Sequence, residues 1–481
     1  MKSSSDSRPR IFALPIGLES TGTRMEFDSL GEIEVPARHY WGAQTQRSLE
    51  HFHIGGDHMP REVYHAYGFV KKAAAIVNAR HGLMPEWMGE LIGQVCDEIV
   101  SGELDTEFPL CVWQSGSGTH TNMNVNEVIS NRCIQLLGGN PGTQSPVHPN
   151  DHVNRSQSSN DTFPTAMHLA GYRLTVEETL PALERLRDAM HGKALAWADV
   201  VKIGRTHLQD ATPLTVGQQW SGYVSSLDEC IADIARATEA LLHIAMGGTA
   251  VGTGLNAPAG FDTEVAAELA ALTGFAFRTA DNKFAAQSTL DRMVRAHAAL
   301  KAAAVTLFKI ANDLRWLGSG PRAGLMELFL PANEPGSSIM PGKVNPSQSE
   351  AMLMVCIEVM ASDTAVQMAG AQGNFELNTF RPTVIRHFLH SARILADACE
   401  GFRKFMIEGI RLNEARIREN VERCVMMVTA LTPEIGYSKA TEIARDAIQH
   451  GRTLKDAAVA HGVAESLYDR LIDPTRMTRP G

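Results

Sequence analysis

One stretch of the chain, between Gly336 and Pro346, carries side chains that suit chemistry better than packing. This stretch contains two adjacent serines, a lysine and an asparagine among glycines and prolines. Glycines and prolines are typical of loops, so several polar side chains lie together in one loop. A helix start follows, because Asn345 suits the N-cap position and Pro346 the first helical position. The free amides of that helix would face the loop and favour an anion. The stretch therefore predicts an active-site loop.

Three further polar segments precede predicted helices. Small residues and hydroxyls fill 115–127, so amides and side-chain donors can meet a carboxylate at a helix start. Asn and Asp residues signal turns at 148–151 and 156–161, before Pro164 opens another helix. Taken alone, each segment is as consistent with ordinary capped helices and turns as with a binding site.

A fourth polar segment, 202–213, contains His207 just before another helical pattern. A lone histidine is more often structural than catalytic, so this residue alone decides nothing. Its interpretation depends on whether the neighbouring motifs belong to one site.

Length and composition limit the possible classes of protein. A chain of 481 residues exceeds what one hydrophobic core usually serves, so two or three domains are expected. Lys and Arg number 44 against 54 Asp and Glu, and the net charge of −10 argues against nucleic acid or anionic membranes as partners. Seven scattered cysteines without a CxxC spacing fit a reducing cytoplasm and give no metal motif.

Long helices must position these segments. Residues 275–317 contain no Gly or Pro, and their apolar side chains recur at three- and four-residue steps, which predicts that most of the span is one amphipathic helix. His297 is the only polar member of that stripe, so we expect a structural histidine. Such long helices predict an elongated bundle whose apolar faces favour self-association.

The Gly336–Pro346 loop resembles the signature loop of the fumarase/aspartase superfamily. Its Pro341-Gly342-Lys343 version, followed by Ser347–Ala351, is similar to that of the class II fumarases. The resemblance runs from about Met25 to Met477, with the separate motifs in the family's order and spacing. Two positions depart from the family pattern, where His120 replaces a glutamine and Glu434 replaces a histidine.

The resemblance implies a mainly α, three-domain fold with a central bundle of long helices. We expect a mixed, mainly helical N-terminal domain over 25–157, the bundle over 158–413 and a small helical C-terminal domain over 414–481. Residues 1–24 precede the resemblance and are expected to be a disordered extension.

The activity that the resemblance implies is reversible hydration of fumarate to L-malate through an aci-carboxylate intermediate. Ser337 would be the base, and His207 with Glu350 the acid/base pair. The residues implied to bind substrate are Ser117, Thr119, Asn122, Ser158, Ser159, Asn160, Thr206, Ser338, Lys343 and Asn345. The segment His148, Pro149, Asn150 and Asp151 resembles a second anion site. This mechanism requires no metal or organic cofactor, and the family's assembly is a homotetramer whose active sites are shared between chains.

Three other classes of protein share part of this pattern. An ammonia lyase such as aspartase shares the loop but typically has glutamine at the position of His207. Lyases acting on argininosuccinate or adenylosuccinate match the other motifs less well. A non-catalytic helical scaffold would fit the bundle but leaves the four polar segments unexplained.

Overall fold

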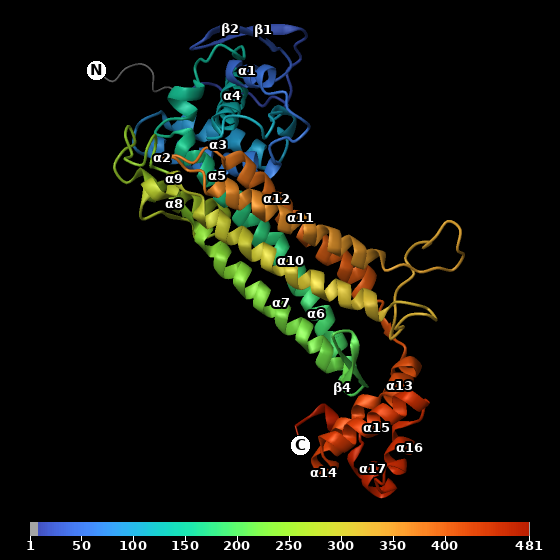
Figure 1. Ribbon diagram of the computed structural model, residues 1–481. Coiled ribbons are helices and arrows are strands. Elements are labelled where there is room, and N and C mark those ends of the chain that lie inside the picture. The colour runs from blue at the N-terminus through green and yellow to red at the C-terminus, as the bar shows by residue number, and fades with distance from the viewer. Residues whose placement is uncertain (1–7, 481) are drawn as a thin grey trace. The chain divides into compact units, whose positions relative to one another are not determined.

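Residues 8–480 are described in a computed structural model, which is dominated by helices (Figure 1). The helices are α1 (Ala43–His51), α2 (Arg61–Arg80), α3 (Glu86–Val100), α4 (Thr119–Leu136), α5 (Ser159–Leu174), α6 (Leu180–Ala196), α7 (Val216–Glu239), α8 (Phe261–Thr273), α9 (Lys283–Ser288), α10 (Asp291–Leu317), α11 (Ser347–Gly370), α12 (Arg381–Phe402), α13 (Glu414–Arg423), α14 (Thr432–Ile435), α15 (Tyr437–His450), α16 (Leu454–Ala460) and α17 (Glu465–Leu471). The predicted mainly α fold is confirmed.

The strands of the described chain pair two by two. They are β1 (Thr23–Asp28) with β2 (Gly31–Pro36), β3 (Val201–Thr206) with β4 (Gln209–Thr215), β5 (His243–Ile244) with β6 (Arg278–Thr279), and β7 (Leu328–Phe329) with β8 (Arg411–Leu412). The chain divides into two compact units. Unit 1 contains the residues up to Leu180 with 233–301 and 358–394, and unit 2 contains 181–232, 302–357 and 395 onward.

In unit 1, α2 packs against α3, α5 and α8, and the β1–β2 hairpin lies beside α1 (Figure 1). α4 is buried along nearly its whole length. Glu127 of α4 accepts hydrogen bonds from the amides of Gly42, Gln44 and Thr45, so a buried carboxylate caps the start of α1.

Unit 2 contains the β3–β4 hairpin and the group of C-terminal helices from α13 to α17 (Figure 1). Leu431, Ile443 and Ala457 are fully buried at the centre of that group, and Ile203 of β3 belongs to the same core. The β3–β4 hairpin therefore packs against the C-terminal helices through β3, and this contact fixes the position of the strands that lead to its tip.

The long helix predicted over 275–317 is confirmed for its greater part, as α10. Asn282 caps the separate short helix α9 before it by accepting from the Ala285 amide. His297 is fully buried on α10, where Nδ1 lies 2.9 Å from Asp363 Oδ1 and Nε2 lies 2.9 Å from Ser391 Oγ. Both ring nitrogens are satisfied by protein partners, as expected for a structural histidine.

Two predicted helix starts are wrong. α5 begins at Ser159, not Pro164, because Ser158 and Asp161 form a capping box ahead of the proline. α11 begins at Ser347, one residue after the predicted start, and Asn345 Nδ2 donates to the Gly336 carbonyl at 2.5 Å, which closes the loop.

The disordered extension expected over 1–24 includes residues 1–7, which lie outside the described residues. Between Phe12 and Gly17 the expectation is wrong, because this segment is bonded to α4. The Phe12 amide donates to the Leu136 carbonyl, and Arg132 donates to the carbonyls of Leu14 and Pro15. Backbone groups that satisfy a buried guanidinium are held in place by it.

Candidate active site

The predicted donors of the 115–127 segment gather at the start of α4. Ser117 Oγ lies 2.7 Å from Thr119 Oγ1, and Ser115 Oγ lies 3.0 Å from Ser117 Oγ. Gly118 precedes the helix with φ of 79°, and a Cβ there would lie 2.0 Å from the Phe163 ring. Only glycine fits this turn, and the turn places two hydroxyls beside the helix amides.

The predicted donors of the 156–161 segment lie at the start of α5, next to the first group. Asn122 Nδ2 donates to Ser159 Oγ at 3.1 Å, which joins the two helix starts. Ser158 Oγ caps α5 by accepting from the Asn160 amide, and Asn160 Nδ2 donates to the Ala250 carbonyl at 2.8 Å. Unit 1 therefore brings Asn122, Ser158 and Ser159 together.

An open pocket of about 670 Å³ lies over these helix starts. Among the predicted residues, it is lined by Asn122, Ser158, Ser159, Asn150 and Asp151. Three of the predicted carboxylate donors and part of the predicted second anion site thus face one space, whereas Ser117, Thr119 and Asn160 do not line it. Its wall consists mainly of hydroxyls and amides, which suits a small polar anion better than an apolar ligand.

The 148–151 segment forms a tight turn that satisfies itself. His148 Nδ1 accepts from the amides of Asn150 and Asp151 at 3.1 Å, and the His148 amide donates to His152 Nδ1 at 2.8 Å. Pro149 opens the π-helical turn that follows. Both amides that could hold a second anion are occupied by the imidazole.

The 336–346 loop lies in unit 2, and its serine accepts backbone hydrogen bonds. Ser337 Oγ accepts from the amides of Met340 at 3.0 Å and Ile339 at 3.3 Å. The Gly336 amide donates to the Lys343 carbonyl at 3.1 Å, which draws the two ends of the loop together. Two amides aimed at one hydroxyl oxygen stabilise its ionised form. Ser338 and Lys343 lie in the same loop, where Lys343 is exposed.

His207 is exposed at the tip of the β3–β4 hairpin. Thr206 pairs with Gln209 across the tip, and His207 and Leu208 have φ of 56° and 60°, as a tight two-residue hairpin turn requires. Glu350 is exposed in the first turn of α11. Within the described residues of unit 2, no hydrogen bond or ion pair joins His207 to Ser337 or to Glu350.

The hairpin is held from behind by a buried ion cluster. Glu327 accepts from Lys202 at 2.8 Å and from Arg205 at 2.6 Å, and its side chain is almost fully buried. Burial alone would raise the pKa of Glu327, but these two cations hold it below its usual value. A charged and doubly paired carboxylate therefore fixes the strand that leads to His207.

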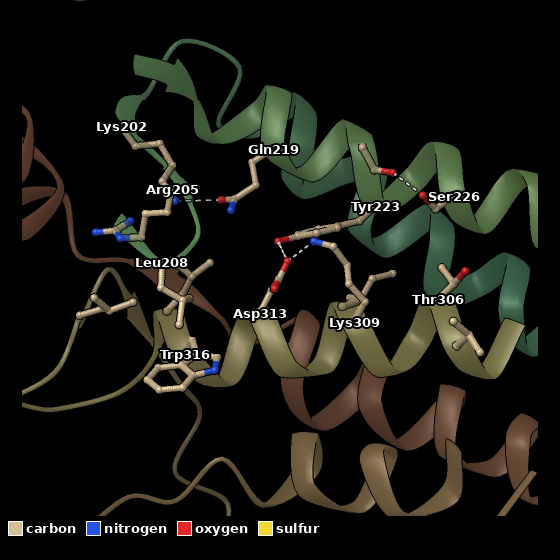
Figure 2. A pocket seen from close by; sticks show the side chains of 15 residues that line it. Lys202, Arg205, Leu208, Gln219, Tyr223, Ser226, Thr306, Lys309, Asp313 and Trp316 are labelled. Carbon is tan, nitrogen blue, oxygen red and sulfur yellow. Dashed lines mark hydrogen bonds and ion pairs between the residues drawn. The ribbon is translucent and has the colours of Figure 1, made fainter. Parts of the chain in front are cut away.

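A second pocket, of about 590 Å³, lies between α7, α10 and this hairpin (Figure 2). Several of its polar side chains pair with one another: Lys202 donates to Gln219 at 3.0 Å, and Asp313 accepts from Tyr223 at 2.9 Å and also from Lys309. Leu208 lines this pocket, but none of the predicted site residues does. The space is therefore distinct from the predicted substrate donors.

His120 and Glu434, the two departures from the family pattern, lie in different environments. His120 is half-buried on α4, with Nδ1 2.9 Å from Ser48 Oγ, and burial lowers its pKa. Glu434 is exposed in α14. His120 is therefore a neutral hydrogen-bonding partner of α1, not a donor to the unit 1 pocket.

The sequence analysis did not identify three buried charged residues that hydrogen-bond to the segments carrying the site residues, namely Lys71, Asp161 and Glu327. Asp161 is fully buried and accepts from the amides of Ser158, Gly247 and Thr249. Lys71 had a usable signal, because it lies at the helical spacing of the buried α2 face. For Glu327 no local signal exists, since its cationic partners Lys202 and Arg205 are more than a hundred residues away.

Comparisons with known proteins cover nearly the whole chain. A family model described as Lyase matches residues 31–361, and one described as Fumarase C C-terminus matches residues 427–479. The chain is 60% identical over 470 residues to "Fumarate hydratase class II" of Methanosarcina acetivorans, covering 98% of this chain and 97% of that protein. It is 56% identical over 454 residues to "Fumarate hydratase class II" of Thermosynechococcus vestitus, covering 94% and 97%. The crystal structure of recombinant class II fumarase from Schistosoma mansoni superposes with a TM-score of 0.94 at 40% identity, over 95% of this chain and 99% of that one.

Proposed function

Because the chain belongs to the class II fumarate hydratase family, we infer that it catalyses the reversible addition of water to fumarate, giving L-malate. The observation that carries this conclusion is the 60% identity to a class II fumarate hydratase along 98% of the chain. The substrate is accordingly a small dicarboxylate.

We propose that, in the direction from L-malate to fumarate, Ser337 removes the proton from the L-malate carbon next to one carboxylate. A serine hydroxyl is a very weak acid, so its alkoxide needs local stabilisation. The amides of Ile339 and Met340, which both donate to Ser337 Oγ, support this role. As the proton leaves, charge grows on the neighbouring carboxylate as an aci-carboxylate, which Lys343 and Asn345 of the same loop are suited to stabilise.

The leaving hydroxyl needs a proton, and we assign its delivery to His207 with Glu350. An imidazole exchanges protons readily near neutral pH, which suits a reaction that runs in both directions. The exposed position of His207 on a rigid, anchored hairpin supports the assignment, because the side chain is free to meet a substrate.

We propose that the hydroxyls and amides at the starts of α4 and α5 hold a substrate carboxylate. Ser117, Thr119, Asn122, Ser158, Ser159 and Asn160 supply neutral donors near two helix N-termini, where an anion is favoured. The pocket of about 670 Å³ over Asn122 and Ser159 supports this placement.

We further propose a homotetramer with active sites shared between chains. α11 exposes Met354, Ile357 and Met368 by 64%, 55% and 66%, an apolar face that a second copy of the chain would cover. Among residues 8–480, α11 is also long and apolar enough to cross a membrane, a property that core helices of soluble proteins share.

We also propose a cytoplasmic location, supported by the lack of any disulfide among the seven cysteines.

The experiment that tests the function follows the absorbance of the fumarate double bond after addition of L-malate or of L-aspartate. We expect absorbance to rise with malate and to stay flat with aspartate. Ser337→Ala and His207→Asn should each lose most of the malate activity, whereas the matched surface changes Ser101→Ala and His450→Asn should keep it. A rise with aspartate alone would refute the hydratase assignment in favour of an ammonia lyase.

A further inference from the structure

Lys71 is a lysine whose burial the proposed chemistry does not explain. Its side chain is fully buried on α2, and no ion pair reaches it from residues 8–480. Nζ donates to Asn154 Oδ1 and to Gln157 Oε1, both at 2.9 Å, and lies 5.6 Å from the centre of the Tyr67 ring. Burying an ammonium group without a carboxylate partner costs free energy. A residue retained at such a cost is expected to serve function.

The ammonium fixes the direction of two amide groups. Burial lowers the pKa of Lys71 to about 7, but the charged and the neutral amino group both have N–H donors for these two bonds, so Asn154 and Gln157 turn their side-chain oxygens toward Nζ. Asn154 Oδ1 also accepts from Asn122 Nδ2 at 3.1 Å. The nitrogen side of Asn122 is thereby held toward Asn154, and its oxygen accepts from Thr162 at 3.3 Å. Lys71 thus sets the orientation of Asn122 through Asn154.

The hydrogen bonds that begin at Lys71 continue to the residues that line the pocket of unit 1. Asn122 Nδ2 donates to Ser159 Oγ at 3.1 Å, so the hydroxyl oxygen of Ser159 is an acceptor in this contact. The hydroxyl hydrogen of Ser159 is then left to donate to a ligand. Asn122, Asn154, Gln157 and Ser159 line the pocket, whereas Lys71 lies behind them.

We propose that Lys71 is a positioning residue for the substrate carboxylate, acting through Asn154 to turn Asn122 and Ser159 toward the pocket. This inference rests on the proposed function of the pocket and names the residue that orders its donors. Lys71 does not touch the substrate, and its effect is on binding, not on the chemical step.

The test compares Lys71→Met with Lys72→Met in the full-length protein. Lys72 is the adjacent residue on α2, but it faces outward and pairs with Asp97 at 2.7 Å. In Lys71→Met we expect the KM for fumarate and for L-malate to rise about tenfold, which corresponds to about 1.4 kcal/mol, with kcat changed less than about threefold. The melting temperature should change little, because relief from burying the amino group is offset by the loss of its donation to Asn154 Oδ1 and Gln157 Oε1 and of its attraction to buried Asp161. Lys72→Met should leave all three quantities unchanged.

A second variant tests the route through Asn154. Asn154→Ala should raise KM to a similar extent, and the Lys71→Met/Asn154→Ala double variant should show no further rise, because both changes break one chain of contacts. If the rise in KM of the double variant equals the product of the two single rises, the two residues act independently, and the route from Lys71 through Asn154 is wrong. Asn154→Ala also keeps the proposal testable if Lys71→Met does not fold.

Two failures are distinguishable. Wild-type protein that does not hydrate fumarate refutes the proposed function, and this inference with it. Active wild type with an unchanged KM in Lys71→Met, or with a fall in melting temperature and a parallel loss of kcat, refutes the positioning role alone and makes Lys71 structural.

Discussion

Asp161→Asn is expected to destabilise unit 1 and loosen two loops of the candidate site together. The carboxylate is fully buried, with Oδ1 accepting from the Ser158 amide at 2.9 Å. Oδ2 accepts from the amides of Gly247 at 3.0 Å and Thr249 at 2.9 Å. Asparagine keeps the shape but offers only one oxygen. Whichever way its amide is turned, an NH₂ group meets at least one backbone N–H.

The magnitude follows from these bonds. A hydrogen bond to a charged group contributes roughly 1.5–3 kcal/mol, and one is lost while at least one other is weakened. The neutral amide is cheaper to bury than the carboxylate, which offsets part of the loss. We therefore expect a net cost of about 3 kcal/mol, which lowers the melting temperature by roughly 5 °C for a unit of this size.

The assay is thermal unfolding at fixed protein concentration, together with the KM for fumarate. The control is Asp97→Asn, whose side chain is 61% exposed and pairs with Lys72. That surface pair is worth less than about 1 kcal/mol, so the control should change neither quantity. An Asp161→Asn protein that melts within about 1 °C of wild type would refute the reasoning that this carboxylate holds both loops.

Two further predictions concern unit 1. Burial would raise the pKa of Asp363, but hydrogen bonds from His297 and Lys301 lower it to about 2. Because the folded-state pKa lies below the unfolded value of about 3.9, the charged form stabilises the protein above that pH, and the stabilisation is lost as pH falls from about 4 toward 2. Asp363→Asn should therefore lower the melting temperature at pH 7, and the difference from wild type should shrink in acid; a constant difference down to pH 3 would contradict this. Deletion of residues 1–18 should lower the melting temperature by several degrees, because the buried guanidinium of Arg132 loses two carbonyl partners; an unchanged melting temperature would show that these contacts contribute nothing.

Much of the fold and of the donor groups could be predicted because their signals are local. The long α10 follows from the periodicity of its apolar residues, and His297 is recognisable as the one polar member of that face. Hydroxyls ahead of α4 and α5 indicate helix starts with free donors, and Asn122 and Ser159 do meet there. Such patterns are set by neighbours in sequence.

The supporting residues could not be predicted because their partners are remote. Lys71 meets Asn154 and Gln157 across more than eighty residues, and Glu327 meets Lys202 across more than a hundred. The N-terminal segment carries no packing pattern of its own, since its hydrogen bonds to α4 come from backbone groups, namely the Phe12 amide and the carbonyls of Leu14 and Pro15. Asn345 fits a cap by residue type, but its side-chain NH₂ group donates across the loop to the Gly336 carbonyl, a contact that no local pattern indicates.

We propose that each active site of the homotetramer takes Ser337 and His207 from different chains, and reassembly of two inactive variants tests this proposal. Ser337→Ala and His207→Asn proteins are unfolded together in equal amounts, refolded, and assayed by fumarate absorbance. Each site would draw its two groups independently with a chance of about one half, so about a quarter of the sites should recover activity. Differently tagged wild-type chains confirm that mixed assemblies form. Mixed assemblies no more active than the two parents would contradict the claim.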